Sequence, residues 1–222
     1  MTGAAARRRL AAATGVAGAG LLGGSLTSPT GSPRFYALTS ALAGTWIAGG
    51  LASGRIPVAS RAAVAAAPVR LVAEPAAVGA ATFGLFYGAA RIARKVPVLD
   101  RAIGGVLRYV HEGSAPLVLL TTAVNGAAEE VFFHGALWDL AAGHRPLPRT
   151  AAAYATFTAA ARNPALLLGG AVTSVIFGLE RHRSGGVLAP AVAHVTWSLL
   201  MLTYLPPLYR PVTTEHPGQP PA

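Results

Sequence analysis

A long apolar stretch of the chain, from about Pro116 to Ala142, carries two adjacent acidic residues, Glu129 and Glu130. It is long enough to cross a bilayer, which takes roughly 20 residues. A carboxylate in mid-membrane costs about 2.5–3.5 kcal/mol on insertion scales, so two in succession indicate a functional site. On a helix Glu130 shares a face with His134, whereas Glu129 points about 100° away. The stretch therefore predicts a buried carboxylate–imidazole pair of the kind that handles protons.

The composition favours an integral membrane protein. Hydrophobic residues make up 53% of the 222 residues and charged residues only 12%, and the apolar blocks are separated by short pieces with arginine or proline. The net charge of +10 also occurs in nucleic-acid binders, but here the arginines flank apolar blocks, where they anchor helices at the membrane edge. We therefore expect no nucleic-acid partner and a multi-pass position in the lipid bilayer of the cell membrane. The chain has no cysteine, which excludes disulfides, thiolate catalysis and cysteine-ligated metals.

We expect an all-α fold, a polytopic transmembrane helical bundle of about six to eight spans. The expected spans are residues 10–26, 35–53, 76–93, 114–142, 165–179 and 187–205, with 151–161 as a short piece of a further span. The first is expected to be a retained helix, and a secretory signal is the alternative. Residues 55–75 are expected to form a loop or surface helix. The basic, periodic segment 91–112 fits an amphipathic helix on the membrane surface or an extension of the preceding span.

Four parts are expected along the chain. They are a basic segment with the first transmembrane helix (1–34), further spans with the basic amphipathic segment (35–112), a helical core with the acidic pair (113–205), and a disordered proline-rich tail (206–222).

Polar residues gather in three clusters in or at the ends of the later spans. The clusters are Glu129, Glu130 and His134; Glu180, Arg181 and His182; and His194 with Ser198 one turn later. Ionisable residues in membrane spans face the bundle interior or a water cavity, so we expect Glu129 and His194 to converge on one polar cavity. A carboxylate there can act as a general base on water, and histidines can orient that water, bind a metal or stabilise an oxyanion. Taken singly, His134 or Ser198 is equally well explained as a buried polar group paired with a neighbouring helix.

Three motifs resemble those of the CPBP family, the CAAX-protease and bacteriocin-processing intramembrane proteases, also called Abi proteins. Glu129-Glu-Val-Phe-Phe-His134-Gly135 is similar to the first motif, a Glu pair followed by three residues and Arg. Phe177-Gly-Leu179 is similar to the second, in which a His follows the Phe by four residues, and His194 with Ser198 resembles the third. The likeness covers about residues 114–205. Two positions depart from the pattern, because His134 replaces the Arg and Arg181 replaces the second-motif His, with His182 one residue later.

The resemblance implies a membrane-embedded endopeptidase, a hydrolase that acts on membrane peptides or proteins. It implies that Glu129 activates the attacking water and that His182 and His194 orient it or stabilise the oxyanion, with help from Ser198. Glu130 and His134 would tune the environment of Glu129. His182 would reach the cavity if the helix ends near Glu180; a continuing helix would turn Arg181 inward to pair with one of the glutamates.

Several alternatives stay open from the sequence alone. No cofactor is certain: two histidines and a glutamate can bind a divalent metal such as zinc, and a metal-free glutamate mechanism fits the same residues. The same fold also suits a catalytically degenerate scaffold or immunity-type protein that binds peptides or partner helices. A proton-coupled transporter is a further idea, which the lack of a visible repeat disfavours.

Overall fold

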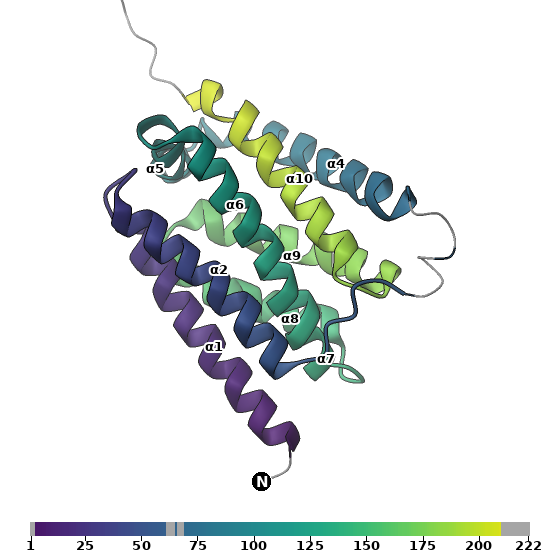
Figure 1. Ribbon diagram of the computed structural model, residues 1–222. Helices are drawn as coiled ribbons and strands as arrows, with labels where there is room; N and C mark the ends of the chain where they lie inside the picture. Colours follow the sequence, from purple (N-terminus) through teal and green to yellow (C-terminus); the bar gives the residue numbers. More distant parts are fainter. Residues whose placement is uncertain (1–2, 61–64, 66–68, 210–222) are drawn as a thin grey trace, which may run out of the picture.

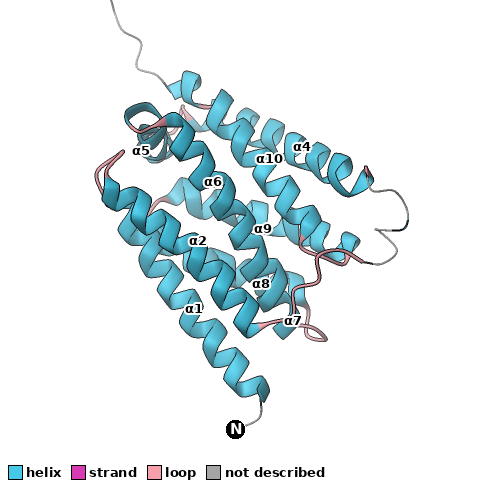
Figure 2. Cartoon of the chain, viewed as in Figure 1, coloured by secondary structure: helices cyan, strands magenta, loops and turns pink. Residues whose placement is uncertain are grey.

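The computed structural model describes residues 3–60, 65 and 69–209, and within them all regular structure is helical, with no strand (Figure 2). The all-α prediction is therefore confirmed. The helices are α1 (Gly3–Leu26), α2 (Pro33–Ser53), α4 (Arg70–Ala93), α5 (Pro97–Glu112), α6 (Ala115–Glu129), the π-helical segment η1 (Glu130–Leu137), α7 (Trp138–Leu140), α8 (Pro146–Thr158), α9 (Pro164–Ser184) and α10 (Leu188–Tyr204), with 3₁₀ turns η2 (Ala159–Ala161) and η3 (Pro206–Tyr209).

Three helices, α2, α4 and α9, are long and apolar enough to cross a membrane. In addition, α6, η1 and α7 follow one another without a break from Ala115 to Leu140, which also exceeds the roughly 20 residues that a span needs. Large apolar side chains lie exposed on the outside of the bundle, among them Leu85 and Leu168, each 58% exposed. Lipid is the solvent in which such a surface is stable. The count of six to eight spans stays a prediction.

The helix with the acidic pair is central. α1 packs along α2, and α4 packs along α10 (Figure 1). Between these two pairs runs α6, which contacts α2 on one side and α10 on the other, while α8 and α9 pack against each other. The acidic pair at the end of α6 is therefore surrounded by other helices.

Aromatic packing anchors the π-helical segment against the first helix pair. The ring of Trp46 on α2 stacks on Phe132, with 4.7 Å between centroids, and lies 5.3 Å from the ring of Phe133. Phe133 in turn packs against Tyr154 of α8 at 4.6 Å. Trp46 also lies against Gly18 of α1, where an added Cβ would overlap the indole ring. These contacts fix the helix segment that begins at Glu130.

Several boundaries differ from the sequence-based expectations. α4 begins at Arg70, six residues before the predicted span, with Pro75 inside the helix. A turn at residues 94–96 separates α4 from α5, so α5 is a helix of its own and not an extension of the preceding span. α9 continues to Ser184, past the expected end near Glu180, because the stop is at Gly185, which has the left-handed conformation of a helix C-terminus (φ 70°).

The proline-rich end is ordered as far as Tyr209, where we expected disorder from residue 206. The Tyr209 hydroxyl donates to the carbonyl oxygen of Ala90 at 3.0 Å, and its ring packs on the cluster of Ala90, Leu107 and Leu205. These apolar contacts hold η3 on the bundle. The expected disorder of residues 210–222, and parts of the expected loop 55–75 (61–64 and 66–68), lie outside the described residues.

Candidate active site

Glu130 lies at the centre of the polar cluster and is fully buried. One of its carboxylate oxygens is hydrogen-bonded to Nδ1 of His134, one turn along the same helix. The other oxygen, Oε1, lies 2.7 Å from Nδ1 of His194 on α10. Both oxygens of Glu130 are thus engaged by histidines, and the carboxylate fixes the orientation of both rings.

His134 is also buried, and its second ring nitrogen is engaged. Its Nε2 lies 3.1 Å from the carbonyl oxygen of Ser174 on α9, which can only accept. That bond requires a proton on Nε2, and the bond between Nδ1 and Glu130 requires a second proton. The Glu130–His134 pair therefore carries no net charge, which makes it compatible with burial.

Glu129 has different surroundings from its neighbour. Its carboxylate accepts a hydrogen bond from the Tyr154 hydroxyl of α8. Its Oε2 lies 4.0 Å from Nε2 of His194, and its side chain keeps 20% exposure. A separation of 4.0 Å is too long for a direct hydrogen bond but suits one bridging water. The structure thus brings the side chains of Glu129 and His194 close together, as we expected.

Small and aromatic residues shape the position of the His194 ring. The ring of Phe177 packs on it at 4.9 Å between centroids. On the other side lies Gly126, where an added Cβ would come within 3.1 Å of the imidazole Cδ2. Any larger residue at 126 would press on the ring, so glycine permits this close approach of α6 and α10.

Three buried polar side-chain atoms near this cluster lack a hydrogen-bond partner among the described residues. They are Oδ1 of Asn125, Oγ of Ser174 and Nε1 of Trp197. Asn125 lies one turn before Glu129 on α6, Ser174 supplies the carbonyl that binds His134, and the Trp197 ring lies 5.7 Å from that of His194. Buried polar atoms are normally hydrogen-bonded, so these three atoms are exceptions among the described residues.

Arg181 stands at the histidine position of the second motif, and it points into the bundle, as a continuing helix predicts. Arg181 is buried, 7% exposed, and its Nε donates to the carbonyl oxygen of His134 at 2.7 Å. Its guanidinium lies over the ring of Trp138, 5.6 Å from the centroid. Arg181 therefore turns inward, as expected for a continuing helix. Its expected partner was Glu129 or Glu130, but it binds the backbone of His134 instead.

His182 lies outside the cluster, contrary to the arrangement in which the helix ends near Glu180. Its side chain is exposed, and its ring faces Trp138 at 6.4 Å between centroids. The physical reason is the regular helix through Ser184, which rotates each residue about 100° from the one before. Glu180 is also away from the cluster, since it pairs with Arg183 at 3.1 Å.

Ser198 is buried one turn after His194, and no hydrogen bond described for the chain joins it to the carboxylates. Tyr154 is the site residue that the sequence analysis missed, because residues 151–161 were read as a short piece of a span. The signal there was a single tyrosine in a run of alanines, whose hydroxyl needs a partner when buried.

The residues around this space do not complete a zinc site. Catalytic zinc sites usually have three protein ligands. Glu129 and Nε2 of His194 face the space, whereas Glu130 and His134 bind each other and His182 is exposed. Within the described part of the chain, no three His, Cys, Asp or Glu residues are arranged to hold a metal ion. We therefore derive no step through a metal.

Comparison with known proteins agrees with the motif analysis. Residues 111–200 match the family model described as Type II CAAX prenyl endopeptidase Rce1-like. Comparisons with curated proteins and with solved structures gave no match. The matched segment runs from the end of α5 into α10 and includes the acidic pair, His134, Arg181 and His194. The helical core at residues 111–200 is therefore similar to the type II CAAX prenyl endopeptidase Rce1-like family, over less than half of the chain.

Proposed function

We propose that this protein is an intramembrane endopeptidase of the cell membrane that hydrolyses peptide bonds of membrane-associated peptides or proteins. The observation that carries the proposal is the facing pair of Glu129 and His194, with 4.0 Å between Oε2 and Nε2. Tyr154 holds the carboxylate and Glu130 holds the imidazole. The match of residues 111–200 to a family model of CAAX prenyl endopeptidases supports the same conclusion.

In the proposed reaction, Glu129 is the general base and water is the nucleophile. A water between Oε2 of Glu129 and Nε2 of His194 donates one hydrogen to each. Its oxygen forms a bond to the carbonyl carbon of the substrate while Glu129 takes one proton. The tetrahedral intermediate then collapses, the C–N bond breaks, and Glu129 returns the proton to the leaving amine.

The remaining residues position this pair. Glu130 accepts from Nδ1 of His194 and so leaves Nε2 free to accept from water. His134 balances the charge of Glu130, and Arg181 holds the backbone of His134. In this mechanism Ser198, buried one turn after His194, assists that histidine. His182 has no part in the mechanism because its side chain is exposed.

The test is the Glu129→Gln variant, which keeps the shape of the side chain and removes its basicity. Purified wild type and variant are compared in cleavage of a membrane peptide in detergent. We expect a loss of about 10²–10⁴-fold, the usual contribution of a general base. The control is Glu74→Gln, because Glu74 lies on the surface and pairs only with Arg70 at 3.7 Å among the described contacts. Equal rates for wild type and Glu129→Gln would exclude Glu129 as the base.

One observation favours a second candidate, a non-catalytic member that binds peptides or partner helices. Arg181 occupies the position of the second-motif histidine, and a guanidinium stays charged at every working pH, so it cannot act as a neutral water-orienting group. In this case wild type binds membrane peptides without cutting them. Arg181→His is then the substitution expected to restore cleavage, whereas an active wild type excludes this candidate.

A further inference from the structure

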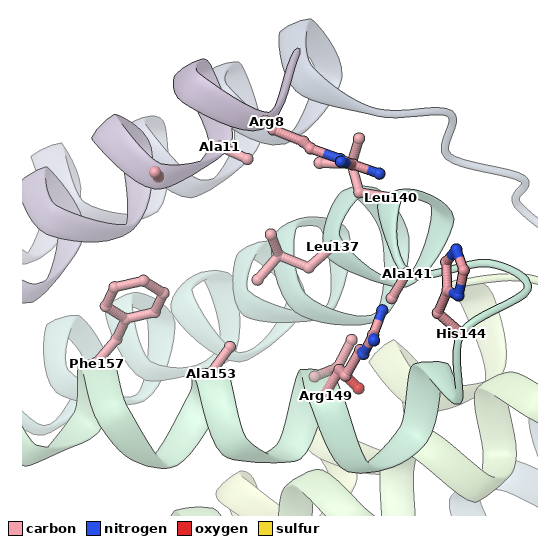
Figure 3. Close-up of a pocket in the computed structure, with 11 residues that line it drawn as sticks. Arg8, Ala11, Leu137, Leu140, Ala141, His144, Arg149, Ala153 and Phe157 are labelled. Atoms are coloured by element: carbon pink, nitrogen blue, oxygen red, sulfur yellow. The ribbon is translucent and has the colours of Figure 1, made fainter. Parts of the chain in front are cut away.

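A cavity of about 490 Å³ opens between α1 and α8, with η1 and α7 as its floor (Figure 3). Sites for small molecules commonly have roughly 300–1,000 Å³. The cavity is separate from the carboxylate cluster, since none of Glu129, Glu130 or His194 lines it. The lining residues are Arg8, Ala11, Ala12, Leu137, Leu140, Ala141, His144, Arg149, Thr150, Ala153 and Phe157.

One end of the cavity is basic. Arg8 reaches it from α1 and Arg149 from α8, and His144 lies beside them in the loop before α8 (Figure 3). No carboxylate is among the lining residues. Asp139, the acidic residue of α7, is already bound by the side chain of Arg7 and by the backbone N–H of Arg55 at 3.1 Å. The positive charge of this end therefore has no counter-charge from the cavity lining.

The rest of the cavity is apolar. Ala11, Leu137 and Ala153 line its wall, and Phe157 lies at the end away from the arginines (Figure 3). The Phe157 ring rests on Gly15 of α1, where an added Cβ would overlap the ring. The hydroxyl of Thr150, the polar group of this wall, is already bonded to the carbonyls of Pro146 and Leu147 at 3.0 and 3.1 Å. Behind the basic end the cavity thus offers hydrocarbon contact only.

We propose that this cavity binds an anionic phospholipid of the surrounding bilayer, with its phosphate at Arg8 and Arg149 and one acyl chain along the wall toward Phe157. A basic end followed by an apolar wall complements an anionic amphiphile. A small soluble anion would bind the arginines but make no contact with the apolar wall. A peptide would bring backbone amides that find no partner there, at a cost for each buried group.

The test is a titration of the purified protein with phosphatidylglycerol and with phosphatidylcholine, followed by native mass spectrometry. We expect wild type to retain one phosphatidylglycerol with at least about tenfold preference over phosphatidylcholine. Arg8→Gln/Arg149→Gln should weaken phosphatidylglycerol binding by about ten- to thirtyfold, since each basic group near an anionic headgroup contributes about three- to fivefold or more. Ala153→Phe, which fills the wall and keeps the charges, should weaken it as well.

The matched control removes the same charge from the other end of the bundle. Arg34→Gln/Arg108→Gln changes two exposed arginines on α2 and α5 and should leave phosphatidylglycerol binding unchanged. Equal loss in this control would show a general charge effect and overturn the proposal. Equal retention of both lipids or competition by inorganic phosphate would overturn it too. So would displacement of phosphatidylglycerol by an apolar peptide with a free carboxylate. The readout is binding, so its outcome is independent of whether the protein cleaves peptides.

Discussion

Glu129 and Glu130 are neighbours in the chain, but their surroundings differ. Both oxygens of Glu130 are bound by histidines, and its side chain is fully buried. Glu129 is held by Tyr154 and keeps 20% of its side chain accessible. A group that must accept and return a proton needs contact with the substrate space. This difference is the reason why the proposed mechanism gives the proton transfer to Glu129 and the positioning to Glu130.

The role of His134 as the counter-charge of Glu130 predicts a large loss of stability on its removal. His134→Ala leaves a fully buried carboxylate without one of its partners, which typically costs about 3–5 kcal/mol. The measurement is denaturant or thermal unfolding in detergent. His111→Ala, an exposed histidine at the end of α5, should change stability by less than about 0.5 kcal/mol. Similar unfolding of both variants would contradict the buried-pair account.

Residues 181 and 182 give opposite predictions for cleavage. His182→Ala should leave the rate within about twofold, because its ring is exposed and outside the cluster. Arg181→Gln should lower the rate by up to about 100-fold, the effect expected when a site residue is displaced by about 1 Å, because its Nε holds the His134 carbonyl. A rate loss in His182→Ala with an unaffected Arg181→Gln would reverse these roles.

At the scale of the elements, the π-helical segment η1 is the special feature of the site. π-helical turns use hydrogen bonds from residue i to i+5, and they are frequent at functional sites. This one begins at Glu130 and includes His134. The ring of Trp46 from α2 and the side chain of Arg181 from α9 hold it from two sides. Its shape therefore depends on helices that are distant in sequence.

The sequence predicts the local parts of this arrangement well. The span at 35–53 corresponds to α2, which begins at Pro33. Its N-cap is Ser32, whose hydroxyl oxygen accepts from the Phe35 N–H at 3.2 Å. The pairing of Glu130 with His134 follows from their spacing of four. The π-helical form of η1, the bond of Arg181 to the His134 carbonyl and the contact of Tyr154 with Glu129 could not be predicted, since they depend on packing between helices that no local pattern encodes. The end of α9 was misjudged because Gly185, and not the polar residues before it, ends the helix.

Packing of α1 on α2 gives a prediction about two glycines of the same helix. Gly18→Val should destabilise the bundle by about 1–3 kcal/mol, the usual cost of overpacking, because its side chain would displace Trp46 from the site segment. Gly20→Val is the control, since an added Cβ there meets no atom within 4 Å. Thermal unfolding in detergent measures both. Equal stability of the two variants would show that α1 does not support the site.

At the scale of the whole molecule, the apolar exterior and the polar interior reverse the pattern of a water-soluble protein. Leucines such as Leu85 and Leu168 lie outside, whereas Glu130, His134 and His194 are buried. Basic residues occur at the helix ends and along α5, as membrane-edge anchors do. The bundle thus encloses a buried polar cluster within an apolar exterior.

The absence of cysteine from the chain makes this arrangement directly testable by single-cysteine labelling. Leu168→Cys should resist a membrane-permeant maleimide in intact membranes, because a thiol in lipid forms little reactive thiolate. Arg101→Cys, on the exposed face of α5, should be labelled readily. After denaturation in detergent, the two cysteine variants should be labelled to the same extent. Equal labelling in intact membranes would contradict the embedding of α9.

The most direct test of the central claim is cleavage by the wild-type protein itself. Purified wild type is reconstituted into liposomes with a set of transmembrane and membrane-bound peptides, and the products are identified by mass spectrometry in ¹⁸O-labelled water. We expect new peptide termini with one ¹⁸O at the new carboxylate, which are absent when Glu129→Gln replaces wild type. Folded wild type that binds the peptides and leaves all of them intact would contradict it.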